Sequence, residues 1–295
     1  MPDRKRKRKP TVSIIGTGRL GTTLATALST KGYEIRSLVA RRAHSARKAA
    51  TLVNTAAMLR DGGVAALAAA QIRSLPQADL FLISVPDDQI AGVAAELTNL
   101  HFDHPPVALH TSGALSSDVL EPLRKKGWHT GSLHPLISVS DARSPIRGAF
   151  WCVEGDSRAV RTAKMIVRDL AGESFSIRSA EKPLYHAAAV MTSGNVTALF
   201  DVALEMLVAS GLTRKTARRI LQPLLVSTVQ NLETKDPAQA LTGTFSRGDV
   251  ETVKRHLAAL QKSGLTDALE LYRLLGKRSL KMAKKPERIT QILNG

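Results

Sequence analysis

The sequence has little of three things that would mark other classes of protein. It holds a single cysteine, Cys152, so no disulfide can form within the chain, and a reducing compartment fits best. Aromatic residues make up only 4% of the chain, which leaves no interleaved aromatic platform for nucleic-acid bases. No apolar run approaches the length that crosses a bilayer, and no signal-peptide core follows the N-terminus. These absences exclude a disulfide scaffold and predict a cytoplasmic protein with no membrane partner.

The chain is strongly basic, with a formal net charge of +17, and much of this charge lies near its ends. Residues 4–9 are all lysine or arginine. A basic run without apolar partners is typical of a solvated segment, so we expect residues 1–10 to form a disordered basic tail. Such ends could also bind nucleic acid by releasing counterions. Because the aromatic platform is lacking, we do not expect nucleic acid as a partner. Binding of nucleic acid through the basic ends stays an alternative.

A glycine motif near the N-terminus predicts a dinucleotide site. The β-branched run "TVSII" leads directly into "GTGRLG", and an apolar-periodic helix follows. In this spacing the first glycine allows a tight turn, the second lets backbone approach a pyrophosphate, and the third lets the helix pack on the strand. The helix N-terminus then holds the phosphates. The loop residues expected to contact the cofactor are Gly16, Thr17, Gly18, Arg19, Leu20 and Gly21.

The end of the second expected strand, "YEIRSLVA", distinguishes NADP from NAD. An NAD site usually has an acidic residue at this point for the ribose hydroxyls. Here the strand is followed by Arg41 and Arg42, and the planar guanidinium groups suit a 2′-phosphate. The sequence therefore predicts NADP(H) as the cofactor.

Three later segments each consist of a strand followed by a polar turn. Because ligands bind at the carboxyl ends of strands in such sheets, these turns are expected to face the cofactor or the substrate. Two histidines without an accompanying carboxylate or cysteine at ligand spacing do not predict a metal site. The expected cofactor contacts are Ser84, Val85, Pro86, His110, Thr111 and Ser112, and the expected substrate contact is His134.

The character of the chain changes near Ala180. Before this point strands alternate with helices, and after it the patterns are helical. We therefore expect an α/β domain with a mostly parallel, doubly wound Rossmann sheet over residues 11–179. An all-α domain for the substrate and for dimerisation is expected over residues 180–285.

With these pieces placed, the chain resembles a known family. The matching stretches are "GTGRLGTTLA", "LISVPDDQI", "LHTSGAL", "SLHPLISV", "FWCVEGD", "KPLYHAAAVMTSGNVTALFDVA" and "ALTGTFSRGDVETVKRHLAAL". They are similar to the Rossmann-like proteins whose C-terminal part is called domain of unknown function 2520. These are relatives of pyrroline-5-carboxylate reductase and of the 6-phosphogluconate dehydrogenase superfamily. The resemblance implies an NADP-dependent oxidoreductase, and a homodimer formed through the helical domain.

The stretch "EKPLYHAAAVMTSGNV" contains the expected catalytic groups. At 100° per residue, Lys182, His186 and Ser193 share one side of a helix that begins near Pro183. The similar hydroxyacid dehydrogenases have a lysine followed four residues later by an asparagine, and here His186 replaces that asparagine. Lys182 and His186 are the expected catalytic residues, with Ser193 and Arg247 as substrate contacts. A solvated surface lysine and a satisfied core histidine are the alternatives.

Together these features predict an NADPH-dependent oxidoreductase that transfers hydride to the carbonyl or imine of a small anionic metabolite. Two other functions stay open at this point. One is an NADP-binding sensor or scaffold without turnover, and the other is a nucleic-acid-associated protein that uses its basic ends.

Overall fold

The computed structural model describes residues 8–57, 63–142 and 144–294. The chain forms two compact units that divide between Val190 and Met191, and each is described by itself. The division comes later than the boundary expected at residue 180, because the first turns of the helix that begins at Lys182 pack on the first unit.

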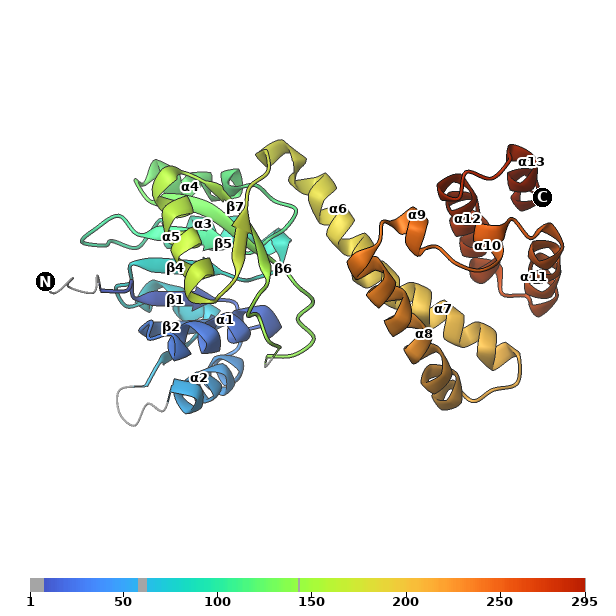
Figure 1. The fold of residues 1–295 in the computed structure, drawn as a ribbon. Coiled ribbons are helices and arrows are strands. Elements are labelled where there is room, and N and C mark those ends of the chain that lie inside the picture. The colour runs from blue at the N-terminus through green and yellow to red at the C-terminus, as the bar shows by residue number, and fades with distance from the viewer. Residues whose placement is uncertain (1–7, 58–62, 143, 295) are drawn as a thin grey trace, which may run out of the picture. The chain divides into compact units, whose positions relative to one another are not determined.

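The first unit is built on one eight-stranded sheet in the order β3-β2-β1-β4-β5-β6-β7-β8 (Figure 1). Every neighbouring pair is parallel except β6 and β7, which are antiparallel. The reversal of strand order between β1 and β4 is the switch point at which doubly wound sheets bind their ligands. The strands are β1 (Val12–Ile15), β2 (Ile35–Ala40), β3 (Ala65–Ala68), β4 (Leu80–Ile83), β5 (Val107–His110), β6 (His129–Leu136), β7 (Phe150–Gly155) and β8 (Glu173–Phe175).

Helices cover both faces of this sheet, so alternate strand residues enter two separate cores. Ile14 lies in a core with residues of α1, α2 and α5, whereas its neighbour Ile15 lies in a core with residues of α3 and α4. The expected doubly wound α/β domain is confirmed. The elements are α1 (Arg19–Thr30), α2 (Ala43–Ala57), α3 (Asp87–Leu97), α4 (Glu121–Lys125) and α5 (Ser157–Asp169), with short 3₁₀ segments η1 (Ala69–Ser74), η2 (Ser117–Leu120) and η3 (Ser179–Glu181).

The second unit is helical throughout its described residues, as expected. Its helices continue past residue 285 as far as Leu293. A small core of Val253, Leu257, Leu280 and Leu293 holds its last helices together. The helices from the unit boundary onward are α6 (Lys182–Thr192), α7 (Gly194–Ala209), α8 (Arg214–Thr234), α9 (Pro237–Ala240), α10 (Thr244–Arg247), α11 (Val250–Ser263), α12 (Thr266–Met282), α13 (Glu287–Thr290) and η4 (Gln291–Leu293).

One helical stretch among the described residues, Ser179–Ala209, is long and apolar enough to cross a membrane by length and composition alone. The expectation that no run approaches this length is wrong by that criterion, because residues 183–200 contain no acidic or basic side chain apart from one histidine. The stretch is interrupted at Ser193, which separates α6 from α7. Only 6% of its most apolar window is buried, so it presents apolar surface.

Candidate functional site

The glycine loop after β1 has the geometry that a dinucleotide site requires. A Cβ atom on Gly16, whose φ is +101°, would overlap the carbonyl oxygen of Ser84, and one on Gly21 would overlap that of Gly16. A Cβ on Gly18 would meet no atom within 4 Å, so the middle glycine borders open space. The loop therefore packs closely at Gly16 and Gly21 and leaves open space at Gly18, an arrangement that would let a pyrophosphate approach the middle glycine.

The N-terminus of α1 is left open for an anion. Gly18 is its N-cap and no side chain caps the helix, and the first turn has no acidic residue. Among the described residues, the hydroxyl oxygen of Thr17 is buried and lacks a hydrogen-bond partner. Unpaired helix N–H groups with a neighbouring hydroxyl are the donors that a pyrophosphate accepts from. The residues present therefore fit a bound dinucleotide.

Arg41 and Arg42 lie directly between the end of β2 and the start of α2. Both side chains are exposed, and neither forms an ion pair within the described part of the chain. Two arginines free of carboxylates at this strand end suit a phosphate on the adenosine ribose.

The turn after β4 lies against the glycine loop, because Gly16 packs on the carbonyl group of Ser84 and the backbone N–H of Ser84 donates to Ile15 O at 2.7 Å. Asp87 begins α3 but is not its N-cap, which is Pro86. Its carboxylate instead accepts a hydrogen bond from Ser112 Oγ at 2.9 Å. That hydroxyl also accepts from the backbone N–H groups of Ala114 and Leu115, so Ser112 holds the turn after β5 in place.

His110 differs from its expected role as a cofactor contact. Its side chain is fully buried, and Nδ1 accepts from the backbone N–H of Ser112 at 3.2 Å. Nε2 lies 3.1 Å from the carbonyl oxygen of Ser116, to which it donates. Burial, together with the charge of Lys182, lowers the pKa of His110 to about 3. The ring is a neutral brace for its own loop, and neither nitrogen is available to a ligand.

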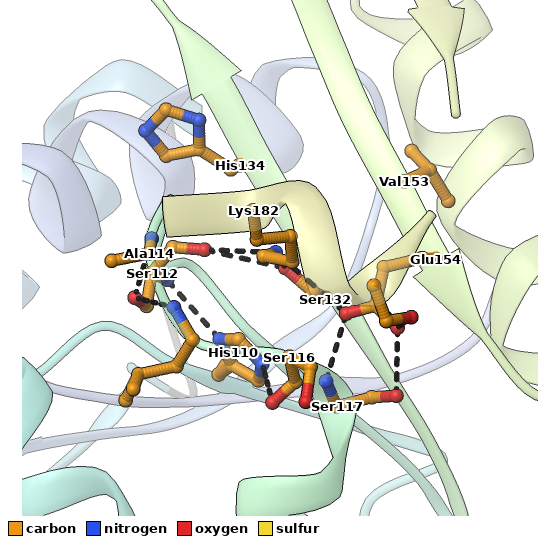
Figure 2. A network of polar contacts seen from close by, with 12 residues as sticks. His110, Ser112, Ala114, Ser116, Ser117, Ser132, His134, Val153, Glu154 and Lys182 are labelled. Carbon is orange, nitrogen blue, oxygen red and sulfur yellow. Dashed lines mark hydrogen bonds and ion pairs between the residues drawn. The ribbon is translucent and has the colours of Figure 1, made fainter. Parts of the chain in front are cut away.

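The position of the Lys182 side chain also differs from the one expected for a catalytic residue. Its side chain has no exposed surface, and Nζ donates to Ser132 Oγ at 2.5 Å and to the carbonyl oxygen of Ser112 at 3.3 Å. Nζ lies 3.6 Å from Glu154 Oε1. Figure 2 shows the ammonium directed toward these three groups, beneath the start of α6.

Glu154 completes this buried network from β7. One carboxylate oxygen accepts the backbone N–H of Ser117 and the other accepts its hydroxyl, both at 2.8 Å (Figure 2). Ser132 is the cross-strand neighbour of Glu154 in the antiparallel β6–β7 pair. The ion pair therefore ties α6, β6, β7 and the β5 loop together.

The partners of Lys182 compensate the cost of burying its charge. Burial lowers its pKa, whereas the charge of Glu154 opposes this shift and favours the ammonium. Because the ammonium is buried with three partners, its role is to hold those groups in position. The structure does not support a direct contact between Lys182 and a substrate, because the ammonium is already enclosed by protein.

The next turn of α6 brings Tyr185 and His186 to His134 on β6. The hydroxyl oxygen of Tyr185 lies 2.7 Å from His134 Nδ1, and the two rings are almost perpendicular at 87°. The rings of His134 and His186 lie 5.4 Å apart, also edge to face. A Cβ on Gly113 would overlap His186 Nδ1 and lie 2.8 Å from His134 Nε2, so a side chain at this position would require at least one imidazole to move.

The side chains of His134 and Tyr185 are partly buried, which sets the protonation of these two groups. Burial, with smaller contributions from His186 and Lys182, lowers the pKa of His134 to about 4. Burial also raises the pKa of the Tyr185 phenol. At neutral pH both groups are uncharged. His186 Nδ1 is buried without a hydrogen-bond partner in the described structure.

Two expected substrate contacts, Ser193 and Arg247, belong to the second unit. Ser193 lies at the break between α6 and α7, and Arg247 ends α10 with an exposed side chain. Of the remaining expected cofactor contacts, Arg19 donates to Ser140 O at 3.4 Å and Leu20 packs against the sheet core. Thr111 is buried beside Ile83. Within the described ranges, no three His, Cys, Asp or Glu side chains form a group that could hold a metal ion.

Sequence reasoning missed the residues that complete the site, namely Gly113, Ser132, Glu154 and Tyr185. One of these residues, Glu154, could have been recognised from the sequence. In the strand "FWCVEG" the glutamate follows an apolar run, and a carboxylate buried in such a strand needs a cation or hydrogen-bond donors as partners. Tyr185 lies directly beside His186, but the sequence alone does not show that both side chains meet His134.

Comparisons with known proteins agree with this architecture. A model of a Rossmann-like domain matches residues 2–135, and a model of domain of unknown function 2520 matches residues 149–279. No curated protein matches the chain.

Several solved structures have a similar fold. A Bacteroides fragilis protein, provisionally described as an NADP oxidoreductase, is 23% identical over 92% of this chain and 98% of its own, with a TM-score of 0.76. A pyrroline-5-carboxylate reductase from Coxiella burnetii is 17% identical over 97% of this chain and 99% of its own, with a TM-score of 0.59. A reductive aminase from Aspergillus terreus, in complex with NADPH, is 15% identical over 97% and 99%, with a TM-score of 0.63.

At these identities the likeness establishes the fold, and the family models identify its two parts. The chain therefore consists of a Rossmann-like domain, matched over residues 2–135, followed by a domain of unknown function 2520, matched over residues 149–279.

Proposed function

We propose that the protein is an NADPH-dependent oxidoreductase that reduces the carbonyl or imine group of a small anionic metabolite. The observation that carries the proposal is the glycine loop, in which Gly16 and Gly21 have no room for a side chain whereas Gly18 borders open space. The proteins of similar fold include a reductive aminase in complex with NADPH and a pyrroline-5-carboxylate reductase, which supports the same reaction class here.

In this proposal different residues of the first unit bind different parts of the cofactor. The N–H groups at the start of α1, with the Thr17 hydroxyl, bind the pyrophosphate. Arg41 and Arg42 bind the 2′-phosphate through their planar forks. The turns after β4 and β5 border the nicotinamide end, because the carboxyl ends of parallel strands share one edge of the sheet. Bound NADPH would supply a hydride.

The substrate class follows from charge. The chain has a net charge of +17. Arg247 is the last residue of the short helix α10, which begins after Gly243, and the Arg247 side chain is exposed. A small metabolite with a carboxylate, such as a 2-keto acid or a cyclic imine acid, matches an arginine fork. We also propose the cytoplasm as the compartment, since the chain has one cysteine and that thiol is buried.

Calorimetry with NADPH and NADH tests the proposal. The protein should bind NADPH more tightly than NADH, and Arg41→Ala with Arg42→Ala should remove that preference without weakening NADH binding. Arg161→Ala, at an exposed arginine of α5, is the control and should leave both affinities unchanged. Oxidation of NADPH is then followed with a panel of 2-keto acids and cyclic imines. Binding without oxidation across the panel would favour a sensor instead.

We further propose a homodimer formed through the helical unit. α7 is an apolar helix of 16 residues with a single buried residue, Leu204, and α8 has 21 residues with only Ala217 buried. An isolated helix pair of this composition would expose an apolar surface that soluble monomers seldom carry. A second copy covers such a surface with a matching one. The exposed apolar side chains are Leu199, Val208, Ile220, Leu224, Val226, Val229 and Leu232.

A further inference from the structure

We propose that Tyr185 donates the proton to the substrate of this reductase and that His134 returns a proton to it. This inference rests on the proposed function and names the acid of the same site. It replaces the expectation that Lys182 or His186 performs this step.

The first argument is that Lys182 is already engaged. Its ammonium is enclosed by Ser112, Ser132 and Glu154, and its side chain has no exposed surface. A proton donor must come within hydrogen-bond reach of the atom that it protonates. Lys182 cannot do so without breaking the buried ion pair, so the donor has to be sought among its neighbours.

Tyr185 is the neighbour with an available proton. It lies three residues after Lys182 on α6 and is partly exposed, and its only hydrogen-bond partner in the described structure is His134 Nδ1. A phenol has one proton to donate and two lone pairs that accept. If His134 donates through Nδ1, the phenolic proton is free to point away from the imidazole. Its ring is held edge-on against Phe175 at 5.8 Å and against His134 at 5.6 Å.

The location of the pair also fits. His134 is near the carboxyl end of β6, beside Gly113 in the turn that follows β5. β1, β4, β5 and β6 are parallel, so this is the edge of the sheet that carries the glycine loop. The pair therefore lies at the end of the sheet where the nicotinamide of a dinucleotide is expected.

The protonation of the pair follows from its surroundings. The groups that face His134 are Tyr185 and His186 on α6, the buried Lys182, and Cys152 opposite it on β7. Burial keeps the pKa of His134 near 4 and raises that of Tyr185, so neither group is charged at neutral pH. Two protons are then shared among the phenol oxygen and the two imidazole nitrogens. The proposed role requires the imidazole proton on Nδ1.

The proton transfer balances and leaves the charge of the protein unchanged. In the reduction of a carbonyl, the carbon gains the hydride that the proposed function provides. The O–H bond of Tyr185 breaks as an O–H bond forms on the substrate oxygen. The Nδ1–H bond of His134 breaks as its proton passes to the phenolate, and Nε2 takes up the one proton that the reaction consumes from solvent. The imidazole ends neutral with its proton on Nε2, and proton exchange with solvent returns it to the Nδ1–H form before the next turnover.

A second tyrosine–histidine pair in the chain provides a matched control. In the helical unit, Tyr272 lies with its hydroxyl 2.7 Å from His256 Nδ1, and the rings meet at 84°. The two pairs have nearly the same geometry, but Tyr272 is on α12 of the helical unit, whose described residues include no strand. Tyr185→Phe and Tyr272→Phe each remove one hydroxyl from one such pair.

The first measurement does not depend on turnover. Nitrogen NMR of ring-labelled histidine, with His134 assigned through its loss in His134→Asn, should show the proton on Nδ1 at pH 7. Tyr185→Phe should move the His134 resonances and Tyr272→Phe should not. A proton on Nε2 would overturn the proposal, because the phenol would then donate to the imidazole.

The second measurement compares the variants in turnover and in binding. Tyr185→Phe should lower kcat about 100-fold or more while the Kd for NADPH stays unchanged, and Tyr272→Phe should match the unaltered protein. Unchanged kcat in Tyr185→Phe would overturn the proposal. Failure of the unaltered protein to bind NADPH would instead contradict the proposed function, while the NMR result still decides the tautomer of His134.

Discussion

The ammonium of Lys182 lies 3.6 Å from the carboxylate of Glu154, and both groups are buried within the first unit. The pair joins the first helical turn of α6 to β7. Through Ser112, Ser117 and Ser132 it also fixes the turn after β5 and the middle of β6. The lysine that the sequence offered as a catalyst is thus part of the support on which the site is built.

Lys182→Met should destabilise the protein strongly. The substitution leaves Glu154 buried without its cation, and removal of one partner from a buried pair costs about 3–5 kcal/mol. Denaturant unfolding measures the loss. Lys254→Met is the control, because Lys254 forms an exposed pair with Glu251 and its removal should change the free energy of unfolding by less than about 1 kcal/mol. Equal effects of the two variants would contradict a structural role for Lys182.

Gly18→Ala and Gly21→Ala should separate cofactor binding from folding. A methyl group at Gly18 meets no protein atom, so the variant should fold with a loss of about 1 kcal/mol or less but bind NADPH at least about tenfold more weakly. A methyl group at Gly21 overlaps the Gly16 carbonyl oxygen and should cost about 1–3 kcal/mol of stability.

Thermal unfolding and calorimetry distinguish these two outcomes. Gly92→Ala is the control, since Gly92 is exposed within α3 and a Cβ there also meets no atom. It should leave NADPH affinity unchanged and slightly raise stability, because alanine favours a helix. Normal NADPH affinity in Gly18→Ala would mean that the pyrophosphate does not approach this loop.

The stability of the protein should fall in mild acid, and His110 is one cause. Its folded pKa of about 3 lies below its ordinary value of about 6.5, so between these values the unfolded chain binds a proton that the folded protein does not. This contribution is therefore complete well above pH 6.5 and is lost as the pH falls through that value toward 3. From pH 6.5 to pH 5.5 the loss should be about 1 kcal/mol.

Denaturant unfolding at these two pH values checks the slope. His110→Asn should be less stable at pH 7, because it loses the bond to Ser116, but its loss on acidification should be smaller. His44→Asn replaces an exposed histidine and should keep the slope of the unaltered protein. Parallel slopes in His110→Asn and the unaltered protein would show that other groups cause the effect.

Leu224→Glu should convert the proposed dimer into a monomer. Leu224 is 63% exposed on α8, and a charge at the centre of an apolar interface opposes association. Light scattering after size exclusion measures the assembly. Phe150→Glu, at a side chain of the first unit that is 50% exposed, should leave the dimer intact. A monomer that sediments with lipid vesicles would contradict the dimer and favour a membrane surface as the occupant.

Local signals predicted the parts of the fold that depend on neighbouring residues. The glycine spacing places the turn, the strand and the helix within one short segment, so Gly16, Gly18 and Gly21 could be assigned roles from sequence. The change from α/β to all-α was visible in the same way. An aspartate directly before a helical run is another local signal, and the carboxylate of Asp249 caps α11 by accepting from the backbone N–H of Thr252.

The direction of the Lys182 side chain could not be predicted, because it depends on a distant partner. The helical period placed Lys182 and His186 on one line, but it did not show which side faces the sheet. Glu154 lies 28 residues earlier on another strand, and only the pairing of β6 with β7 brings it under α6. His110 was misjudged for a related reason, since its loop folds back to accept and donate hydrogen bonds at the same ring.

Gly113 has a consequence for how this site can change over generations. The two imidazoles of His134 and His186 occupy the space that any side chain at position 113 would take. A descendant that gains even a methyl group there must give up or move at least one histidine. We therefore expect positions 113, 134 and 186 to vary together among relatives.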